Sequence, residues 1–223
     1  EEFFKDKPKI QPKMIGYVPR VGLVNGLFAT AAGMGGITII EAFKTPNETK
    51  LALTITGQQG DVMKESITCA KTIAWNLLPD SVKNKILVNI KKEKTQPFGI
   101  HIHCPEAATP KDGPSAGAAI TLAMVSLLTG IPVNNEVAMT GEIDLNGYVH
   151  TIGGLELKID GGKYAGVKKI LVPEGNRQDL DIIKLRNPDI LVDIEIVVVE
   201  TIWQVLEHTL VGSKLKFNRY IDN

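Results

Sequence analysis

The stretch from Ala108 to Gly130 constrains the fold more than any other part of the chain. It begins with a turn-rich loop, Ala-Thr-Pro-Lys-Asp-Gly-Pro, and continues through Ser115 into a run of small and apolar residues. The run ends at Gly130, which is followed by Ile131 and Pro132, and this order is typical of a helix C-terminus. The pattern therefore predicts a buried helix with Ser115 at its start.

Two interpretations of Ser115 follow from this position. A serine directly before a helix is most often an N-cap, whose side chain accepts a hydrogen bond from a backbone N–H group. The same position also suits a nucleophile, because free backbone N–H groups and the positive end of the helix dipole favour a developing oxyanion. The local sequence leaves both interpretations open.

The remaining elements predict a mixed α/β fold, with a strand-rich first half and alternating strands and helices in the second half. Strands 21–30 and 37–44 form an expected hairpin. A further strand is expected at 51–56, followed by a helix from Asp61, as its cap, to about Leu78, with Val62 on its buried face. Residues 80–97 are polar and poorly patterned, so no element is expected there. Further elements are strands at 100–104, 137–142, 147–151, 169–172 and 194–199, and helices at 155–165, 179–185 and 201–210.

Residues 1–15 read as an N-terminal arm or linker, 16–210 as one domain and 211–223 as a C-terminal tail. The chain does not begin with Met and has no signal-peptide pattern, so we expect a fragment of a longer protein. The 25 basic and 25 acidic residues balance, which argues against nucleic acid as the main partner. No apolar run approaches the roughly 18 residues of a membrane span, so no membrane association is expected. Two cysteines do not make a disulfide framework, and we expect a reducing intracellular compartment, cytoplasmic or mitochondrial.

Three motifs carry a resemblance to a known family. Residues 110–117 read Pro-Lys-Asp-Gly-Pro-Ser-Ala-Gly, residues 138–143 read Ala-Met-Thr-Gly-Glu-Ile, and residues 152–155 read Ile-Gly-Gly-Leu. Together they resemble the proteolytic domain of the Lon proteases, and the resemblance runs from about Gly16 to Leu206. It implies the Lon proteolytic-domain fold and a serine endopeptidase of unfolded or damaged proteins, with a catalytic dyad of Ser115 and Lys158.

Lys158 has a physical argument of its own as a general base. An exposed lysine has a pKa of about 10.4 and is protonated at neutral pH, whereas burial among apolar groups lowers that pKa. The neighbours Leu155, Leu157 and Ile159 could supply such a pocket. The competing lysine, Lys111, lies on the loop and is expected to be exposed.

The resemblance also assigns supporting residues. It places Thr140 beside the dyad, where its hydroxyl would hold the lysine, although a threonine chosen for β-propensity is the alternative. It places Glu65 near the active-site face, where a solvated helix glutamate is equally expected. Asp112 and Gly113 belong to the serine loop, and backbone N–H groups near Gly113 and Ser115 would stabilise the oxyanion.

His101 and His103 lie two apart on a predicted strand, so both point to one face. They could ligate zinc, but no third ligand has convincing spacing, and a Ser–His–Asp arrangement is also conceivable. The resemblance instead gives them, and His103 in particular, a flanking structural or substrate-groove role, with no metal.

The chain contains no Gly-x-x-x-x-Gly-Lys-Ser/Thr motif for nucleotide phosphates, so no cofactor is expected in this domain. The resemblance implies ATP and Mg only for an upstream AAA+ ATPase module, and a homo-hexameric ring. A non-catalytic, ring-forming interaction domain on the same fold is the alternative function. The sequence departs from the family pattern at Gly161-Gly162, where two helix glycines are expected to cost on the order of 1 kcal/mol each.

Overall fold

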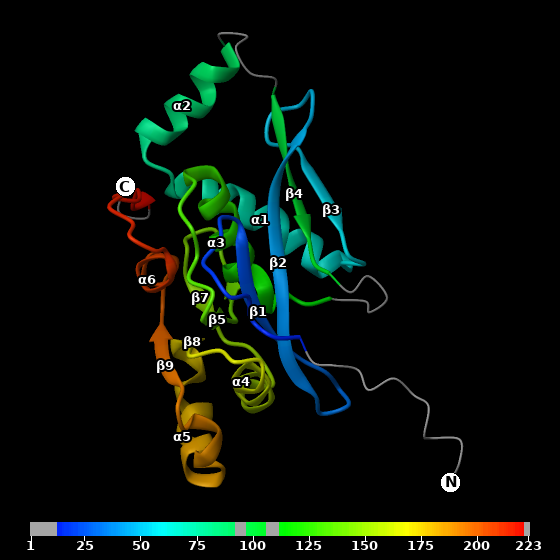
Figure 1. The fold of residues 1–223 in the computed structure, drawn as a ribbon, viewed down its shortest axis with the longest axis vertical. Coiled ribbons are helices and arrows are strands. Elements are labelled where there is room, and N and C mark those ends of the chain that lie inside the picture. Colours follow the sequence, from blue (N-terminus) through cyan, green and yellow to red (C-terminus); the bar gives the residue numbers. More distant parts are fainter. Residues whose placement is uncertain (1–12, 92–96, 106–111, 221–223) are drawn as a thin grey trace, which may run out of the picture.

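A seven-stranded sheet forms the centre of the protein in the computed structural model, which describes residues 13–91, 97–105 and 112–220. The strand order is β3-β4-β2-β1-β5-β8-β9 (Figure 1). The strands β1, β2 and β4 pair antiparallel, whereas β3–β4, β1–β5, β5–β8 and β8–β9 pair parallel. The strand bounds are β1 Leu23–Ala29, β2 Gly35–Pro46, β3 Leu53–Thr56, β4 Phe98–His103, β5 Val137–Met139, β8 Lys169–Pro173 and β9 Glu195–Val199.

A small second sheet pairs β6 Glu142–Ile143 with β7 Val149–His150. The helices are α1 Asp61–Leu77, α2 Asp80–Lys91, α3 Gly117–Thr129, α4 Leu155–Tyr164, α5 Arg177–Arg186 and α6 Ile202–Thr209, with short 3-10 helices at Pro114–Ala116, Glu174–Asn176 and Pro188–Leu191. The mixed α/β fold predicted from the sequence is confirmed.

The alternation of side chains along the strands gives the sheet two apolar faces and therefore two cores. The larger core joins α1, α3 and α6 to one face, with Val24, Ile40 and Ile102 from the sheet. The smaller core joins α4 and α5 to the other face, with Leu27 and Ile170 from the sheet. Figure 1 shows α2 and α5 at opposite ends of the long axis.

The hairpin expected in the first half is present, and its register runs from Leu23 opposite Glu41 to Ala29 opposite Gly35. At its turn, the Thr30 N–H donates to the Met34 carbonyl over 2.8 Å. The predicted strand 137–142 is instead split into β5 and β6. The residues between the two strands, Thr140 and Gly141, hydrogen-bond to the loop that carries Ser115.

Two expectations about helices are wrong. Residues 80–91 form α2, whose Val82 and Ile86 pack against the larger core and make a stripe too short to stand out among polar neighbours. In α1, Val62 is exposed and Met63 is buried, and the helix begins one residue earlier than a cap at Asp61 would have it. The N-cap position belongs to Gly60, and Asp61 is the first helical residue.

Residues 213–220, here called the C-terminal strap, return to the middle of the chain. The Asn218 N–H donates to the Leu77 carbonyl, and Asn218 Nδ2 donates to the Leu78 carbonyl, both over 2.9 Å. The Trp203 indole donates to the Asn218 carbonyl over 3.0 Å, and the Trp203 and Tyr220 rings lie 5.5 Å apart. The strap therefore joins α6 to the end of α1. The predicted division into arm, domain and tail stays a prediction.

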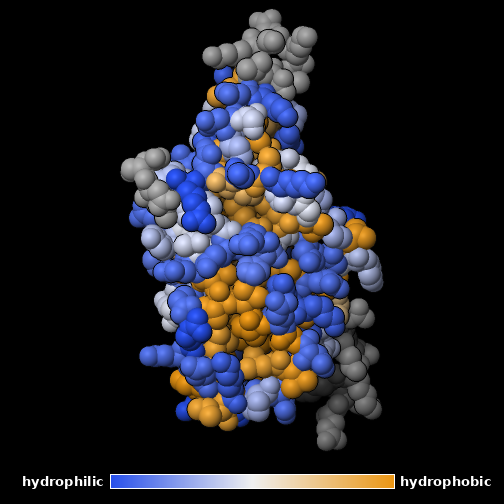
Figure 2. Space-filling model, turned by 90° about the vertical axis from the view of Figure 1, so that its left-hand side faces the viewer, coloured by the Kyte–Doolittle hydropathy of each residue, from blue (hydrophilic) through white to orange (hydrophobic). Residues whose placement is uncertain are grey.

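The face that carries α6, β9 and α5 has a broad apolar area with a hydrophilic surround (Figure 2). Strand β9 is the last strand of the sheet on this side, and its Ile196, Val197 and Val198 are half-buried. Contiguous apolar surface of this kind marks interaction sites in many proteins. None of the helices within the described ranges is long and apolar enough to cross a membrane.

Candidate active site

The loop before α3 presents Ser115 from a short 3-10 helix, Pro114–Ala116. Gly113 opens this turn with φ at +138°, a conformation that side chains with a Cβ rarely adopt. The Ser115 carbonyl accepts hydrogen bonds from the Gly141 N–H at 2.7 Å and from Thr140 Oγ1 at 3.3 Å. The Ala118 N–H donates back to the Gly141 carbonyl at 3.1 Å. The β5–β6 connection therefore fixes the backbone at the serine.

The interpretation of Ser115 as the N-cap of α3 is wrong. The N-cap position belongs to Ala116, and no side chain caps the helix there. Ser115 lies one residue earlier, inside the 3-10 turn.

Asp112 reaches from the serine loop to the start of α1. Its Oδ1 atom accepts hydrogen bonds from the Met63 N–H at 3.0 Å and from the Gly113 N–H at 3.1 Å. A Cβ added at Gly60 would lie only 2.4 Å from the Asp112 carboxyl carbon, so the contact requires glycine at that position. Asp112 therefore caps α1, although the two residues in the hydrogen bond lie 49 positions apart in the sequence. From the sequence, Asp112 was expected only as a residue of the serine loop.

Lys158 lies in α4 and is only 4% exposed. Its Nζ atom donates to Thr140 Oγ1 over 3.1 Å. Burial lowers the pKa of Lys158 to about 8, because desolvation disfavours the charged ammonium form. The Thr140 hydroxyl has one proton, which it donates to the Ser115 carbonyl, so Thr140 can only accept from the lysine.

Ser115 and Lys158 line one cleft of about 500 Å³. Asp112 also lines it, as do Gly153 of the Ile-Gly-Gly-Leu motif and two residues that the sequence did not indicate, Phe28 and Thr30 at the end of β1. The sequence predicted Phe28 and Thr30 only as residues at the end of a hairpin strand. Their closeness to the serine could not be predicted, because it depends on how α4 packs on the hairpin. Among the described residues, no hydrogen bond joins Ser115 Oγ to Lys158 Nζ.

The other predicted supporting residues lie elsewhere. Glu65 is exposed on α1 and does not line the cleft that the described residues form. His101 Nε2 and His103 Nδ1 share hydrogen bonds with Thr56 Oγ1 on the neighbouring strand, at 2.8 and 2.6 Å, and neither lines the cleft. Lys111 lies outside the described residues. Within the described ranges, no group of three or more His, Cys, Asp and Glu side chains could hold a metal ion.

Comparisons with known proteins agree with this architecture. A family model of the Lon protease (S16) C-terminal proteolytic domain matches residues 2–212. A Lon protease homolog of Acanthamoeba polyphaga mimivirus is 43% identical over 209 residues, which cover 91% of this chain and 20% of the relative. The Lon protease of Lachnoclostridium phytofermentans is 43% identical over 206 residues, 92% of this chain and 24% of the relative. Lon protease 2 of Thermus thermophilus is 40% identical over 213 residues, 95% of this chain and 25% of the relative.

The class of protein that these matches define is a peptidase domain. More narrowly, the chain belongs to the Lon protease family, in the region of its C-terminal proteolytic domain. The resemblance drawn from the sequence motifs is therefore confirmed. The chain spans between a fifth and a quarter of the length of these curated relatives.

Proposed function

We propose that this chain is a serine endopeptidase domain in which Ser115 is the nucleophile and Lys158 the general base. One observation carries the proposal: a buried lysine with a lowered pKa lines the same cleft as a serine presented by a helix-start turn. With a pKa of about 8, about a tenth of Lys158 is neutral at pH 7, against less than a thousandth for an exposed lysine.

The proposed mechanism begins when neutral Lys158 takes the proton from Ser115 Oγ, which attacks the peptide carbonyl carbon. Because Lys158 donates an N–H to Thr140, the lone pair on its nitrogen stays available for the serine proton. The resulting ammonium then protonates the leaving amine, and water hydrolyses the acyl-enzyme. Lys158 acts as the base in this second half as well.

The oxyanion needs hydrogen-bond donors at the serine loop. The Ser115 N–H is our candidate, because the first amides of a helical turn have no partner within that turn. The Gly113 N–H already donates to Asp112 Oδ1, so it can contribute only when that bond opens. Asp112 and Thr140 would then position the loop and the lysine respectively, without touching the reacting atoms.

We propose that this chain is the protease part of an ATP-dependent Lon-type machine, and that the machine degrades unfolded polypeptides. The family membership supports this, as does the small share of the relatives' length that the chain covers. ATP and Mg would act only in an AAA+ module. A homo-hexameric ring is the proposed assembly, and the apolar area in Figure 2 offers a surface that a second copy could cover.

Covalent labelling tests the dyad directly. A fluorophosphonate probe should modify Ser115, as read by mass spectrometry of the peptide that contains it. The labelling rate should rise with pH through about 8, whereas a histidine base would give a rise near pH 6.5. Lys158→Met should abolish labelling, and Lys163→Met, a matched control on the same helix, should leave it unchanged. Peptide cleavage retained by Ser115→Ala, or labelling retained by Lys158→Met, would refute the assignment.

A further inference from the structure

A second cavity of about 440 Å³ adjoins the cleft that contains Ser115 and Lys158. The two share a wall made by residues 152–154 and Leu157. The far side of the second cavity comes from α5, so the cavity lies between the helix that carries Lys158 and the helix that follows it. A polypeptide held in the cleft therefore lies next to residues that also line the second cavity.

The lining of this cavity combines apolar walls with two carboxylates. Ile182 and Ile183 from α5 and Leu157 from α4 supply branched apolar surface, and Glu156 and Asp179 supply the carboxylates. None of the described residues that line it is basic.

Both carboxylates have neutral partners. Asp179 Oδ2 accepts a hydrogen bond from Asn176 Nδ2 at 2.6 Å, and Glu156 Oε1 accepts one from Asn187 Nδ2 at 3.1 Å. An amide donor satisfies one oxygen of a carboxylate without cancelling its charge.

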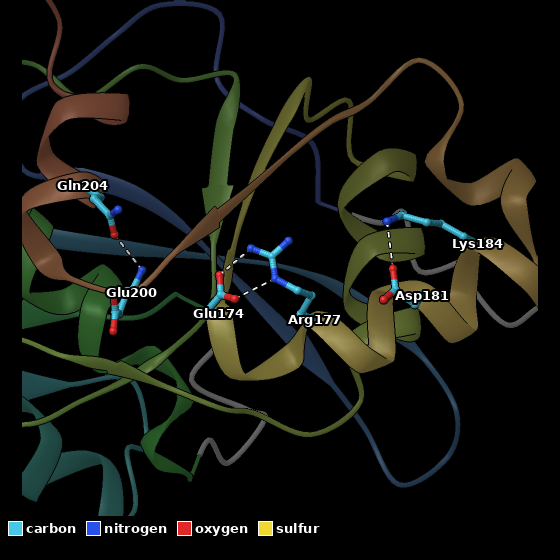
Figure 3. Close-up of polar contacts among 6 residues, drawn as sticks. All are labelled: Glu174, Arg177, Asp181, Lys184, Glu200 and Gln204. Carbon is cyan, nitrogen blue, oxygen red and sulfur yellow. Dashed lines mark hydrogen bonds and ion pairs between the residues drawn. The ribbon is translucent and has the colours of Figure 1, made fainter.

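The nearby basic side chains of α5 are engaged elsewhere. Figure 3 shows Arg177 paired with Glu174 through two contacts of 2.6 Å, and Lys184 paired with Asp181 at 3.0 Å. Within the described part of the chain, no ion pair reaches Asp179 or Glu156. The cavity therefore keeps two negative charges next to apolar walls.

We infer that the second cavity binds an arginine or lysine side chain of the polypeptide substrate, an inference that rests on the proposed endopeptidase function. The aliphatic stem of such a side chain suits the apolar walls, and its cationic end suits the carboxylates of Glu156 and Asp179. Successive side chains of an extended peptide point to opposite sides, so a substrate in the cleft can direct one of them into this cavity. The cavity thus selects substrates with a basic residue at one fixed distance from the scissile bond.

The test compares peptides that differ at one position. A series of quenched fluorescent peptides carries either arginine or citrulline, its neutral counterpart of equal shape, at each position around one cleavage site. At one position, the arginine peptide should be cleaved with a kcat/KM about tenfold higher, and this ratio should fall as salt screens the charges. Binding of the same peptides to the Ser115→Ala variant, measured by fluorescence anisotropy, should show the same preference without any cleavage.

Variants assign the preference to the cavity. Asp179→Asn and Glu156→Gln keep the shape and a hydrogen-bond acceptor, and together they should bring the arginine-to-citrulline ratio close to one. Asp181→Asn is the matched control, because that carboxylate lies on the same helix but pairs with Lys184 (Figure 3). Equal binding of the two peptides at every position, or a ratio that survives the double substitution, overturns the inference. Absence of cleavage of all peptides refutes the proposed function instead, and the binding measurement still decides the cavity.

Discussion

At the scale of single residues, Lys158 is the one acidic or basic side chain that is buried among the described residues. Its pKa is lowered from 10.5 to about 8 by desolvation, which means that the folded protein disfavours the ammonium form that the unfolded chain prefers. Between about pH 8 and 10.5 the unfolded state binds more protons, so the free energy of unfolding rises with pH in that window. Below pH 8 both states are protonated, and the full cost of the buried charge is present.

We predict that Lys158→Met raises the free energy of unfolding at pH 7 by about 1–3 kcal/mol while it removes peptidase activity. Methionine fills a similar volume and carries no charge, and the Thr140 hydroxyl keeps its bond to the Ser115 carbonyl. The gain in stability should shrink as the pH rises from 8 to 10.5. Urea denaturation of both proteins at pH 7 and pH 10 measures this, and a gain that does not depend on pH would show that Lys158 is not desolvated.

The sequence anticipated some of these residues and missed others for a physical reason. Ser115 and Lys158 stood out because a chemical role and a motif coincided in each, and the structure brings both to one cleft. Phe28 did not stand out, and Asp112 was expected only as a supporting residue of the serine loop, because the contacts of both depend on long-range packing that no local pattern encodes. Glu65 and His103 are placed away from the cleft, and their supporting roles stay predictions.

At the scale of elements, α4 lies unusually close to the start of β2. A Cβ added at Gly161 would lie 2.1 Å from the Gly35 carbonyl carbon, and one added at Gly35 would lie 1.7 Å from the Leu157 carbonyl oxygen. Gly161, the first of the two adjacent helix glycines, therefore permits this contact. The cost of Gly161 in helix propensity is offset by the close packing of the helix that carries Lys158.

We predict that Gly161→Ala destabilises the protein by more than 2 kcal/mol, although helix propensity alone would give a gain of about 1 kcal/mol. The clash is with backbone atoms, which cannot rotate away. Gly162→Ala is the matched control, since its Cβ would meet only the ends of the Leu27 and Ile170 side chains, at 3.0 Å. Thermal unfolding of both variants checks this, and equal melting temperatures would contradict the close approach.

The remaining differences between sequence and structure also belong to this scale. The hairpin and the second-half helices were predictable because each carries its own periodicity and turn residues. Helix α2 was not, because Val82 and Ile86 are the core contacts among its described side chains and most of its residues are polar. The break between β5 and β6 escaped prediction as well, because hydrogen bonds from Gly141 to a loop far away in sequence cause it.

At the scale of the whole molecule, the C-terminal strap connects the end of the described chain to its middle. Asn218 contacts the end of α1 at residues 77 and 78, and Trp203 lies over Gly147 in the β6–β7 turn. Trp203 therefore links the strap to the turn of the β6–β7 pair. Strand β6 of this pair packs next to the 3-10 helix that carries Ser115. The strap also lies beyond residue 212, where the family model ends.

We predict that Asn218→Ala lowers the free energy of unfolding by about 1–3 kcal/mol, because it leaves the Leu78 carbonyl without its side-chain donor in a partly buried place. Trp203 lies in contact with the strap, so its fluorescence reports the loss directly. Tyr220→Phe is the companion variant: the Tyr220 hydroxyl is buried with no hydrogen-bond partner among the described residues, so its removal should stabilise the protein. The two substitutions should therefore change the free energy of unfolding in opposite directions. An Asn218→Ala variant with an unchanged free energy of unfolding would show that the strap does not stabilise the fold.

The order of strands in the sheet has a consequence for the newly made chain. Strand β1 supplies one wall of the cleft, and its Asn25 side chain donates to the Val137 carbonyl, 112 positions further along. At ribosomal speeds of about 5–20 residues per second, that partner arrives roughly 6 to 22 seconds after β1 has been made. Lys158 is translated later still. During synthesis, therefore, the growing polypeptide carries the serine loop before Lys158 has been made, and under the proposed function it cannot cut other chains until Lys158 has left the ribosome.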